Sequence, residues 1–176
     1  MPRWIVVGAG TGGTSATIGR YLRYRRHDTE LAVVDPEGSA FYPSWKSGDM
    51  TVTTGKSSRI EGIGRPRVEP SFVPGVIDTM LEVPDAASVA AMVHLRTMTG
   101  LRAGPSTGTN LWGVWQLVAQ MVERGERGSI VSLMCDGGER YAGSYNNDAW
   151  LAEKNLDPAP HLGVIESFFA TGRWEG

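Results

Sequence analysis

A glycine-rich loop near the N-terminus constrains this chain more than any other feature. The apolar residues Trp4 to Val7 predict a strand, and the next seven residues, up to Thr14, read Gly-Ala-Gly-Thr-Gly-Gly-Thr. Glycine adopts positive φ angles without strain and lets other groups approach the main chain closely. A helix that begins after such a loop presents unpaired N–H groups and a partial positive charge. The loop therefore predicts a strand, a turn and a helix whose N-terminus binds a phosphate.

Two kinds of phosphorylated cofactor fit this loop when it is considered alone. Gly8, Gly10 and Gly13 satisfy the spacing G-x-G-x-x-G, which is typical of dinucleotide-binding proteins. Asp35 follows the next apolar run, residues 31–34, at about the separation expected of a carboxylate that binds ribose hydroxyls. An oxidoreductase that binds NAD(P) is therefore an alternative, and the rest of the chain has to decide between the two.

Apolar periodicity predicts strands that alternate with helices. The predicted strands are 4–7, 31–34, 101–103 and 129–135, and the predicted helices are 15–26, 85–99 with Asp85 as N-cap, and 111–122. Residues 36–83 are rich in Gly, Pro and Ser and predict a long loop. This order predicts a parallel sheet covered on both faces, with a ligand bound beyond the carboxyl ends of its strands.

Composition predicts one globular domain and excludes several function classes. The chain has 176 residues, of which 41% are hydrophobic and 20% charged, and its net charge of -2 argues against a general affinity for nucleic acid. Cys135 is the only cysteine, so no intrachain disulfide forms and a reducing cytoplasm is expected. No apolar run approaches the length of a membrane span. The three histidines, His27, His94 and His161, have no metal-ligand spacing, and no metal is expected.

Four segments, in the same order, resemble the later half of the fold type II pyridoxal-phosphate enzymes, in the group of cysteine synthase and cystathionine β-synthase. They are 10–14 (Gly-Thr-Gly-Gly-Thr), 61–64 (Glu-Gly-Ile-Gly), 104–108 (Gly-Pro-Ser-Thr-Gly) and 135–141 (Cys-Asp-Gly-Gly-Glu-Arg-Tyr). Residues 57–72 and 104–110 look closest to cysteine desulfhydrase-like members. Gly137 departs from the pattern, since many members carry serine there. The resemblance implies an α/β fold of three layers, similar to the large domain of tryptophan synthase β-like enzymes and truncated at the N-terminus.

The resemblance also implies which residues contact the cofactor, pyridoxal 5'-phosphate. Ser106 matches the position that meets the pyridine nitrogen, where a hydroxyl donates a hydrogen bond to the unprotonated atom. A ring held in this way is a milder electron sink, which suits β-elimination or β-replacement on cysteine or O-activated serine. Asp136 either orients Ser106 or caps a loop. The implied cofactor-binding residues are Gly10, Thr11, Gly12, Gly13, Thr14, Ser106 and Asp136, and the implied substrate loop is Gly62, Ile63 and Gly64.

A lysine that could form the Schiff base is missing from the matched segments. The family's lysine lies upstream of the phosphate loop, and none of Lys46, Lys56 and Lys154 sits in a similar sequence. We therefore expect residues 1–176 to form a single α/β domain, the C-terminal portion of a longer enzyme, with 152–176 as a C-terminal tail and no catalytic residue. The implied partners are a small cysteine-like amino acid and a second copy in a homodimer. A non-catalytic remnant or partner subunit stays open as an alternative.

Overall fold

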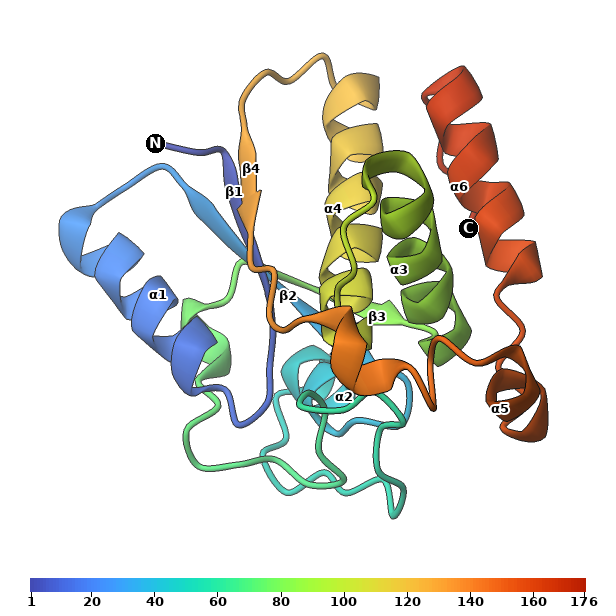
Figure 1. Ribbon diagram of the computed structural model, residues 1–176. Helices are drawn as coiled ribbons and strands as arrows, with labels where there is room; N and C mark the ends of the chain where they lie inside the picture. The colour runs from blue at the N-terminus through green and yellow to red at the C-terminus, as the bar shows by residue number, and fades with distance from the viewer.

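Four parallel strands lie at the centre of the computed structural model, which describes residues 1–176 (Figure 1). The strands are β1 (Trp4–Gly8), β2 (Glu30–Pro36), β3 (Thr79–Val83) and β4 (Ile130–Ser132), and their order across the sheet is β3-β2-β1-β4. Each neighbouring pair runs parallel, with Val6 opposite Ala32 in the central pair. Their carboxyl ends therefore all meet at one edge of the sheet, where the loops 9–12 and 48–73 lie (Figure 1).

Helices cover both faces of this sheet. Helix α1 (Gly13–Arg25) lies on one face, and α3 (Asp85–Thr99), α4 (Pro105–Glu123) and α6 (Ala159–Thr171) lie on the other (Figure 1). The shorter helices are α2 (Phe41–Ser47) and α5 (Asp148–Glu153), and the single 3-10 turns are η1 (Pro74–Val76) and η2 (Gly138–Tyr141). The α/β class with a parallel sheet and helices on both faces, expected from the sequence, is confirmed.

Two apolar cores follow from the alternation of side chains along the strands. Val6 and Val34 point into a core shared with α3, α4 and α6, whereas Val7 and Val33 point into a core shared with α1 and α2. All four valines are fully buried. Their strands are apolar on both faces for this reason, as is typical of a parallel sheet. A sheet buried on both faces fixes the positions of the loops at its carboxyl edge.

The predicted strand 129–135 is shorter in the structure. Strand β4 pairs with β1 only from Ile130 to Ser132. Beyond Ser132, polar side chains of α4 take the backbone groups that a longer strand would use: the Asn110 amide donates to the Leu133 carbonyl at 3.0 Å, and the Thr107 hydroxyl accepts from the Cys135 N–H at 3.0 Å. The predicted end of the strand at residue 135 was wrong, because the contacts that end it come from residues far away in the sequence and leave no local signal.

Other boundaries also differ from the predictions. The predicted strand 101–103 is only an isolated bridge between Ala103 and Gly137. Asp85 is the first residue of α3 and not its N-cap, because Pro84 holds that position and the Asp85 carboxylate pairs with Arg59 at 2.8 Å. The segment predicted as a loop, 36–83, contains β3, α2 and η1. Helix α4 begins six residues earlier than the apolar pattern indicated, at Pro105 rather than Leu111.

No helix in the structure has the length and apolar character required to cross a membrane.

Candidate functional site

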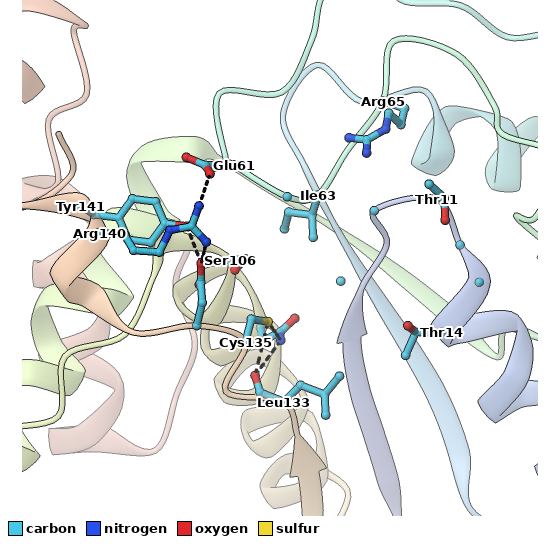
Figure 2. A pocket seen from close by; sticks show the side chains of 17 residues that line it. Thr11, Thr14, Glu61, Ile63, Arg65, Ser106, Leu133, Cys135, Arg140 and Tyr141 are labelled. Carbon is cyan, nitrogen blue, oxygen red and sulfur yellow. Dashed lines mark hydrogen bonds and ion pairs between the residues drawn. The ribbon is translucent and has the colours of Figure 1, made fainter.

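The four segments on which the family resemblance rests meet around one cavity at the carboxyl edge of the sheet. Its volume is about 520 Å³. The glycine loop forms one wall, residues 61–65 approach from the long loop, and the start of α4 and the segment after β4 form the opposite wall (Figure 2). Of the predicted site residues, the structure brings together Gly10, Thr11, Gly12, Gly13, Thr14, Gly62, Ile63, Ser106 and Asp136 around this cavity, and only Gly64 lies outside its lining.

The glycine loop offers unused hydrogen-bond donors to the cavity. None of the backbone N–H groups of Gly10, Thr11, Gly12, Gly13 and Thr14 has an acceptor within the chain. The carbonyl groups of the same loop are used, because Ala9 accepts from the Gly64 N–H at 2.8 Å and Thr11 accepts from the Ser71 hydroxyl at 2.7 Å. The loop is thus fixed through its acceptors, and its donors are left for an anion at the N-terminus of α1.

Two of these glycines are required by close approach of the neighbouring chain. A Cβ on Gly12 would lie 2.6 Å from the Phe72 Cα, and Gly12 has a φ of 89°. A Cβ on Gly10 would lie 2.7 Å from the carbonyl oxygen of Gly62. Side chains at either position would push the long loop away from the cavity. The spacing of glycines in the loop therefore serves packing as well as anion binding.

The segment Glu61–Gly64 lies over the cavity. Gly62 and Gly64 have φ angles of 90° and 75°, a backbone conformation that favours glycine. Between them Ile63 points toward the cavity and is 8% exposed (Figure 2). Gly64 itself is boxed in by Ser58, Pro36 and Ser39. The predicted substrate loop is therefore packed directly against the glycine loop.

Ser106 faces the glycine loop across the cavity. It lies in the first turn of α4, is 5% exposed, and its hydroxyl makes no hydrogen bond within the chain. The hydroxyls of Thr11 and Thr14 on the opposite wall also have no partner in the chain, and both residues are exposed to solvent (Figure 2). Hydroxyl groups without partners on both walls are suited to hydrogen-bond a polar ligand between them.

Asp136 belongs to a small charged network rather than to Ser106. Its Oδ2 atom accepts a hydrogen bond of 2.6 Å from the Tyr141 hydroxyl and lies 3.7 Å from Arg140, which also pairs with Glu61 at 3.3 Å. Burial, together with the bond to the Asp136 carboxylate, raises the pKa of Tyr141, so this hydroxyl stays a donor. The Oδ1 atom of Asp136 is buried against Gly104 and has no partner. The network ties the substrate loop to the segment after β4.

Asp35 does not reach the cavity. Its side chain is fully buried, and its Oδ2 atom accepts a hydrogen bond of 2.7 Å from the Tyr42 N–H in the first turn of α2. Burial raises the pKa of Asp35 to about 7. A carboxylate that binds ribose hydroxyls has to face the ligand. The dinucleotide alternative required Asp35 to face a ligand, and the structure contradicts that requirement.

Arg65 and Asn110 are among the residues that line the cavity without having been predicted as site residues. Arg65 directly follows the substrate loop, and Asn110 follows Ser106 by one helical turn, with its Oδ1 atom buried and unpartnered. The four-residue spacing of Ser106 and Asn110 on one helix could have indicated Asn110, because residues at i and i+4 share a face. Nothing local in the sequence singles out Arg65, since its position depends on how the long loop folds over β1.

Comparison with protein-family models identifies the family to which this chain belongs. The model described as pyridoxal-phosphate dependent enzyme matches residues 1–136, which include the glycine loop, the substrate loop and Ser106. This chain belongs to the pyridoxal-phosphate dependent enzymes. The resemblance read from the sequence is confirmed, and membership of this family implies pyridoxal 5'-phosphate as the cofactor.

Relatives within the family include enzymes of cysteine metabolism. An L-cysteine desulfhydrase of Mycobacterium tuberculosis is 59% identical over 173 residues, which cover 98% of this chain and 47% of that protein. A cysteine synthase 2 of Schizosaccharomyces pombe is 33% identical over 164 residues, covering 87% of this chain and 41% of that protein. The chain therefore spans about half the length of the curated relatives it matches.

A solved structure has the same fold. The crystal structure of O-ureido-L-serine synthase superimposes with a TM-score of 0.65 at 23% identity, covering 86% of this chain and 47% of that one. This match places the four-stranded sheet and its helices within the fold of that enzyme.

The residues around the cavity fit the cofactor that the family implies. Five consecutive unpaired N–H groups suit a phosphate dianion, and the glycines at 10 and 12 leave no Cβ in the way. The Ser106 hydroxyl on the opposite wall is a donor without a protein acceptor and suits a ring nitrogen. A phosphate donor set and a hydroxyl are therefore separated by a cavity in which an aromatic ring can lie.

Proposed function

We propose that this chain supplies the phosphate and pyridine contacts of a pyridoxal-phosphate enzyme that catalyses β-elimination or β-replacement on cysteine or O-activated serine. The observation that carries the proposal is the row of unpaired N–H groups at residues 10–14, which faces the free hydroxyl of Ser106 across one cavity. Relatives described as L-cysteine desulfhydrase and cysteine synthase support the choice of substrate class.

Each wall of the cavity has a role in this proposal. The N–H groups of residues 10–14, helped by the hydroxyls of Thr11 and Thr14, bind the phosphate, and the partial positive charge at the start of α1 adds to their attraction. Ser106 donates a hydrogen bond to the ring nitrogen and leaves it uncharged. When bound, the cofactor supplies an electron sink for the substrate carbanion. Ile63 excludes water from above the site, and Asp136 holds the Tyr141 hydroxyl in place.

The lysine that forms the Schiff base is proposed to come from a segment outside residues 1–176. No lysine lines the cavity, and Lys46, Lys56 and Lys154 are all exposed. A relocated lysine would have to reach the aldehyde group of the cofactor from one of these exposed positions. We further propose that residues 1–176 are a single domain, the C-terminal portion of the enzyme, with 152–176 as its tail.

The test is the visible absorption of the purified chain titrated with pyridoxal phosphate, followed by borohydride reduction and mass mapping of lysines. We expect saturable binding of pyridoxal phosphate, much weaker binding of pyridoxal, which lacks the phosphate, and no trapped lysine. Ser106→Ala should shift the absorption maximum of the bound cofactor and keep its phosphate-dependent affinity within about tenfold, since one neutral hydrogen bond contributes about 1 kcal/mol. Equal affinity for pyridoxal and pyridoxal phosphate would contradict the proposal.

A non-catalytic partner subunit is the second candidate, and the absence of a lysine from the cavity favours it. An assay of sulfide release from L-cysteine separates the candidates when it is run on the chain alone and on the chain mixed with a segment that carries the family's lysine. Sulfide release only in the mixture would support the enzyme, and a trapped Lys46 or Lys56 with sulfide release from the chain alone would mean that the lysine has been relocated. Cofactor binding without sulfide release in either case would favour a partner role for this chain.

Association and location complete the proposal. We propose a homodimer, in which each copy binds a small cysteine-like amino acid, and a cytoplasmic location. The free, exposed thiol of Cys135 at the cavity supports a reducing compartment, because an accessible thiol beside a sulfur-handling site is readily oxidised elsewhere.

A further inference from the structure

Arg59 joins the long loop to two other parts of the chain. Its Nε atom donates to the Asp85 carboxylate at the start of α3 at 2.8 Å, and its Nη1 atom donates to the Lys154 carbonyl oxygen at the end of α5, also at 2.8 Å. Its own carbonyl oxygen accepts a hydrogen bond from the Tyr145 hydroxyl. Because Arg59 stands just before the predicted substrate loop, residues 62–64, these contacts fix the approach to that loop.

Burial of the Asp85 carboxylate makes this contact directional. The Asp85 side chain is 2% exposed, and its Oδ2 atom pairs with Arg59 while its Oδ1 atom is buried without a partner. A buried carboxylate that loses its cation is strongly destabilising. The Arg59 side chain is 42% exposed, so without this partner it would be free to extend into water. The carboxylate therefore holds the guanidinium, and with it the long loop, in one position.

An apolar cluster beneath the substrate loop joins the same parts of the chain. Ile60 and Ile63 are both buried and belong to this cluster. Its other members come from α3 and from residues 141–156, and they are Val89, Met92, Tyr141, Tyr145, Leu151 and Leu156. The substrate loop therefore rests on a support built from α3 and the segment after β4, and the polar contacts of Arg59 reach both parts of that support.

The position of the substrate loop determines two walls of the cavity. The Gly64 N–H donates to the Ala9 carbonyl oxygen at 2.8 Å. The Gly62 carbonyl oxygen lies so close to Gly10 that a Cβ there would be 2.7 Å away. Ile63 lines the cavity between these two contacts. A shift of the loop would therefore move the wall that Ile63 forms and also disturb the glycine loop, whose N–H groups face the ligand.

A second polar link to the loop is the weaker of the two. The ion pair between Glu61 and Arg140 has a separation of 3.3 Å, and its side chains are 58% and 67% exposed. Water screens an exposed pair, and such pairs contribute at most about 1 kcal/mol. The pair between Arg59 and Asp85 is shorter and has one buried member. We therefore expect Arg59 to contribute more to the position of the loop than Arg140.

We propose that Arg59 is a positioning residue for the cofactor cavity: through Asp85 and the Lys154 carbonyl group, it fixes the substrate loop against the glycine loop. This inference rests on the proposed function, since it concerns the loop of that same cavity. Arg59 does not line the cavity and acts only through the loop that follows it. Residues 141–156 thereby support the site, although only Tyr141 among them lines the cavity.

Two measurements on the 176-residue chain test the inference without requiring catalysis. The first is hydrogen exchange of the Gly64 N–H by NMR, relative to the amides of β2, because this N–H is bonded to the glycine loop. The second is the visible circular dichroism of bound pyridoxal phosphate, which reports on the surroundings of the ring. The variants are Arg59→Met, Arg59→Lys and the double variant Arg59→Met with Asp85→Asn. The double variant leaves no unpaired charge at the start of α3 and carries the test if Arg59→Met alone does not fold.

Two control variants separate positioning from stability. Arg67→Met removes a guanidinium of the same long loop that pairs with Glu69 and does not line the cavity. Ile165→Val removes a methyl group from the core between the sheet and α6, away from the cluster beneath the loop, and lowers stability without touching Arg59.

We expect the Gly64 N–H to exchange about tenfold faster or more in Arg59→Met and in the double variant, as expected when a charge-assisted hydrogen bond that holds the loop is lost. The visible band of bound pyridoxal phosphate should change in the same variants. Arg59→Lys should restore part of the protection, because an ammonium group can pair with Asp85 but lacks the fork that also reaches the Lys154 carbonyl oxygen. Neither control variant should have these effects.

Three results would overturn the inference. The first is unchanged Gly64 exchange in the double variant. The second is faster exchange with an unchanged visible band, since the loop would then move without affecting the cavity. The third is an equal effect of Ile165→Val, since Arg59 would then contribute only to the stability of the whole chain.

The pyridoxal-phosphate titration of the unaltered chain reports on the proposed function separately. Normal cofactor binding together with unchanged Gly64 exchange in the variants would refute the inference alone. Failure of the unaltered chain to bind the cofactor would refute the proposed function, while Gly64 exchange would still decide whether Arg59 fixes the loop.

Discussion

Gly12 combines two constraints at a single residue. Its φ of 89° lies in the left-handed region, and a Cβ there would meet the Phe72 backbone at 2.6 Å. We expect Gly12→Ala to lower the free energy of unfolding by at least about 2 kcal/mol and to weaken pyridoxal-phosphate binding, because strain and overlap add. Gly48→Ala is the control, with a φ of 75° and no atom within 4 Å. Urea denaturation should show about 1 kcal/mol of loss for the control, and equal losses in both would contradict the argument.

Asp35 gives the chain a pH dependence that one substitution removes. Burial raises the pKa of Asp35 from 3.8 to about 7. Between these values the folded chain binds more protons than the unfolded chain, so the contribution of Asp35 to stability is present at low pH and is lost as pH rises toward 7. Relative to Asp35→Asn, the unaltered chain should lose on the order of 3 kcal/mol between about pH 4 and pH 8. The free energy of unfolding of both proteins is measured by urea denaturation across this pH range. Parallel curves of this free energy against pH would refute the proposed contribution of Asp35.

At the scale of elements, the contact between α3 and α4 depends on Gly108. A Cβ at this position would lie 2.0 Å from the Ser88 carbonyl oxygen of α3, and the Ser88 and Thr109 hydroxyls are 2.7 Å apart beside it. We expect Gly108→Ala to lower the free energy of unfolding by about 1–3 kcal/mol, since backbone cannot move aside easily. Gly163→Ala in α6, where no atom lies within 4 Å, should instead stabilise by up to about 1 kcal/mol. Denaturation followed by circular dichroism distinguishes these signs.

The elements that the sequence predicted well are those with local signals. Helix α1 follows from the glycine loop, and α3 ends at Gly100 as expected, with a φ of 76°. Strand β3 was missed because Thr-Met-Leu-Glu-Val is short, and its pairing comes from β2. Helix α2 was missed because it contains Pro43 and because a distant carboxylate, Asp35, accepts from its first turn.

The candidate site also combines features that have a local sequence signal with features that depend on distant contacts. Segments 10–14, 61–64, 104–108 and 135–141 were predicted to meet, and most of their residues surround one cavity. The free guanidinium of Arg65 could not be predicted, because its isolation depends on Arg140 satisfying both nearby carboxylates, which is a property of the folded chain.

At the scale of the whole molecule, the β4 edge of the sheet is open. Val131, Leu133 and Met134 are 49%, 47% and 62% exposed, and β4 has a hydrogen-bonded neighbour on one side only. An apolar strand edge pairs readily with another chain. We expect the chain to self-associate, and Val131→Lys to reduce the association without lowering the melting temperature. Sedimentation velocity at increasing concentration is the measurement, with Tyr24→Lys on exposed α1 as control. Equal association of all three proteins would show that another surface is responsible.

The groups proposed to bind the phosphate are main-chain N–H groups, which every amino acid except proline possesses. Because the N–H groups of residues 10–14 belong to the main chain, substitutions of the exposed Thr11 and Thr14 side chains leave those donors in place. Arg65, Ser106 and Asn110, in contrast, line the cavity through side chains that a single codon change replaces. Under the proposed function, mutation can therefore alter the side-chain contacts of the site while the main-chain donors for a phosphate are inherited unchanged.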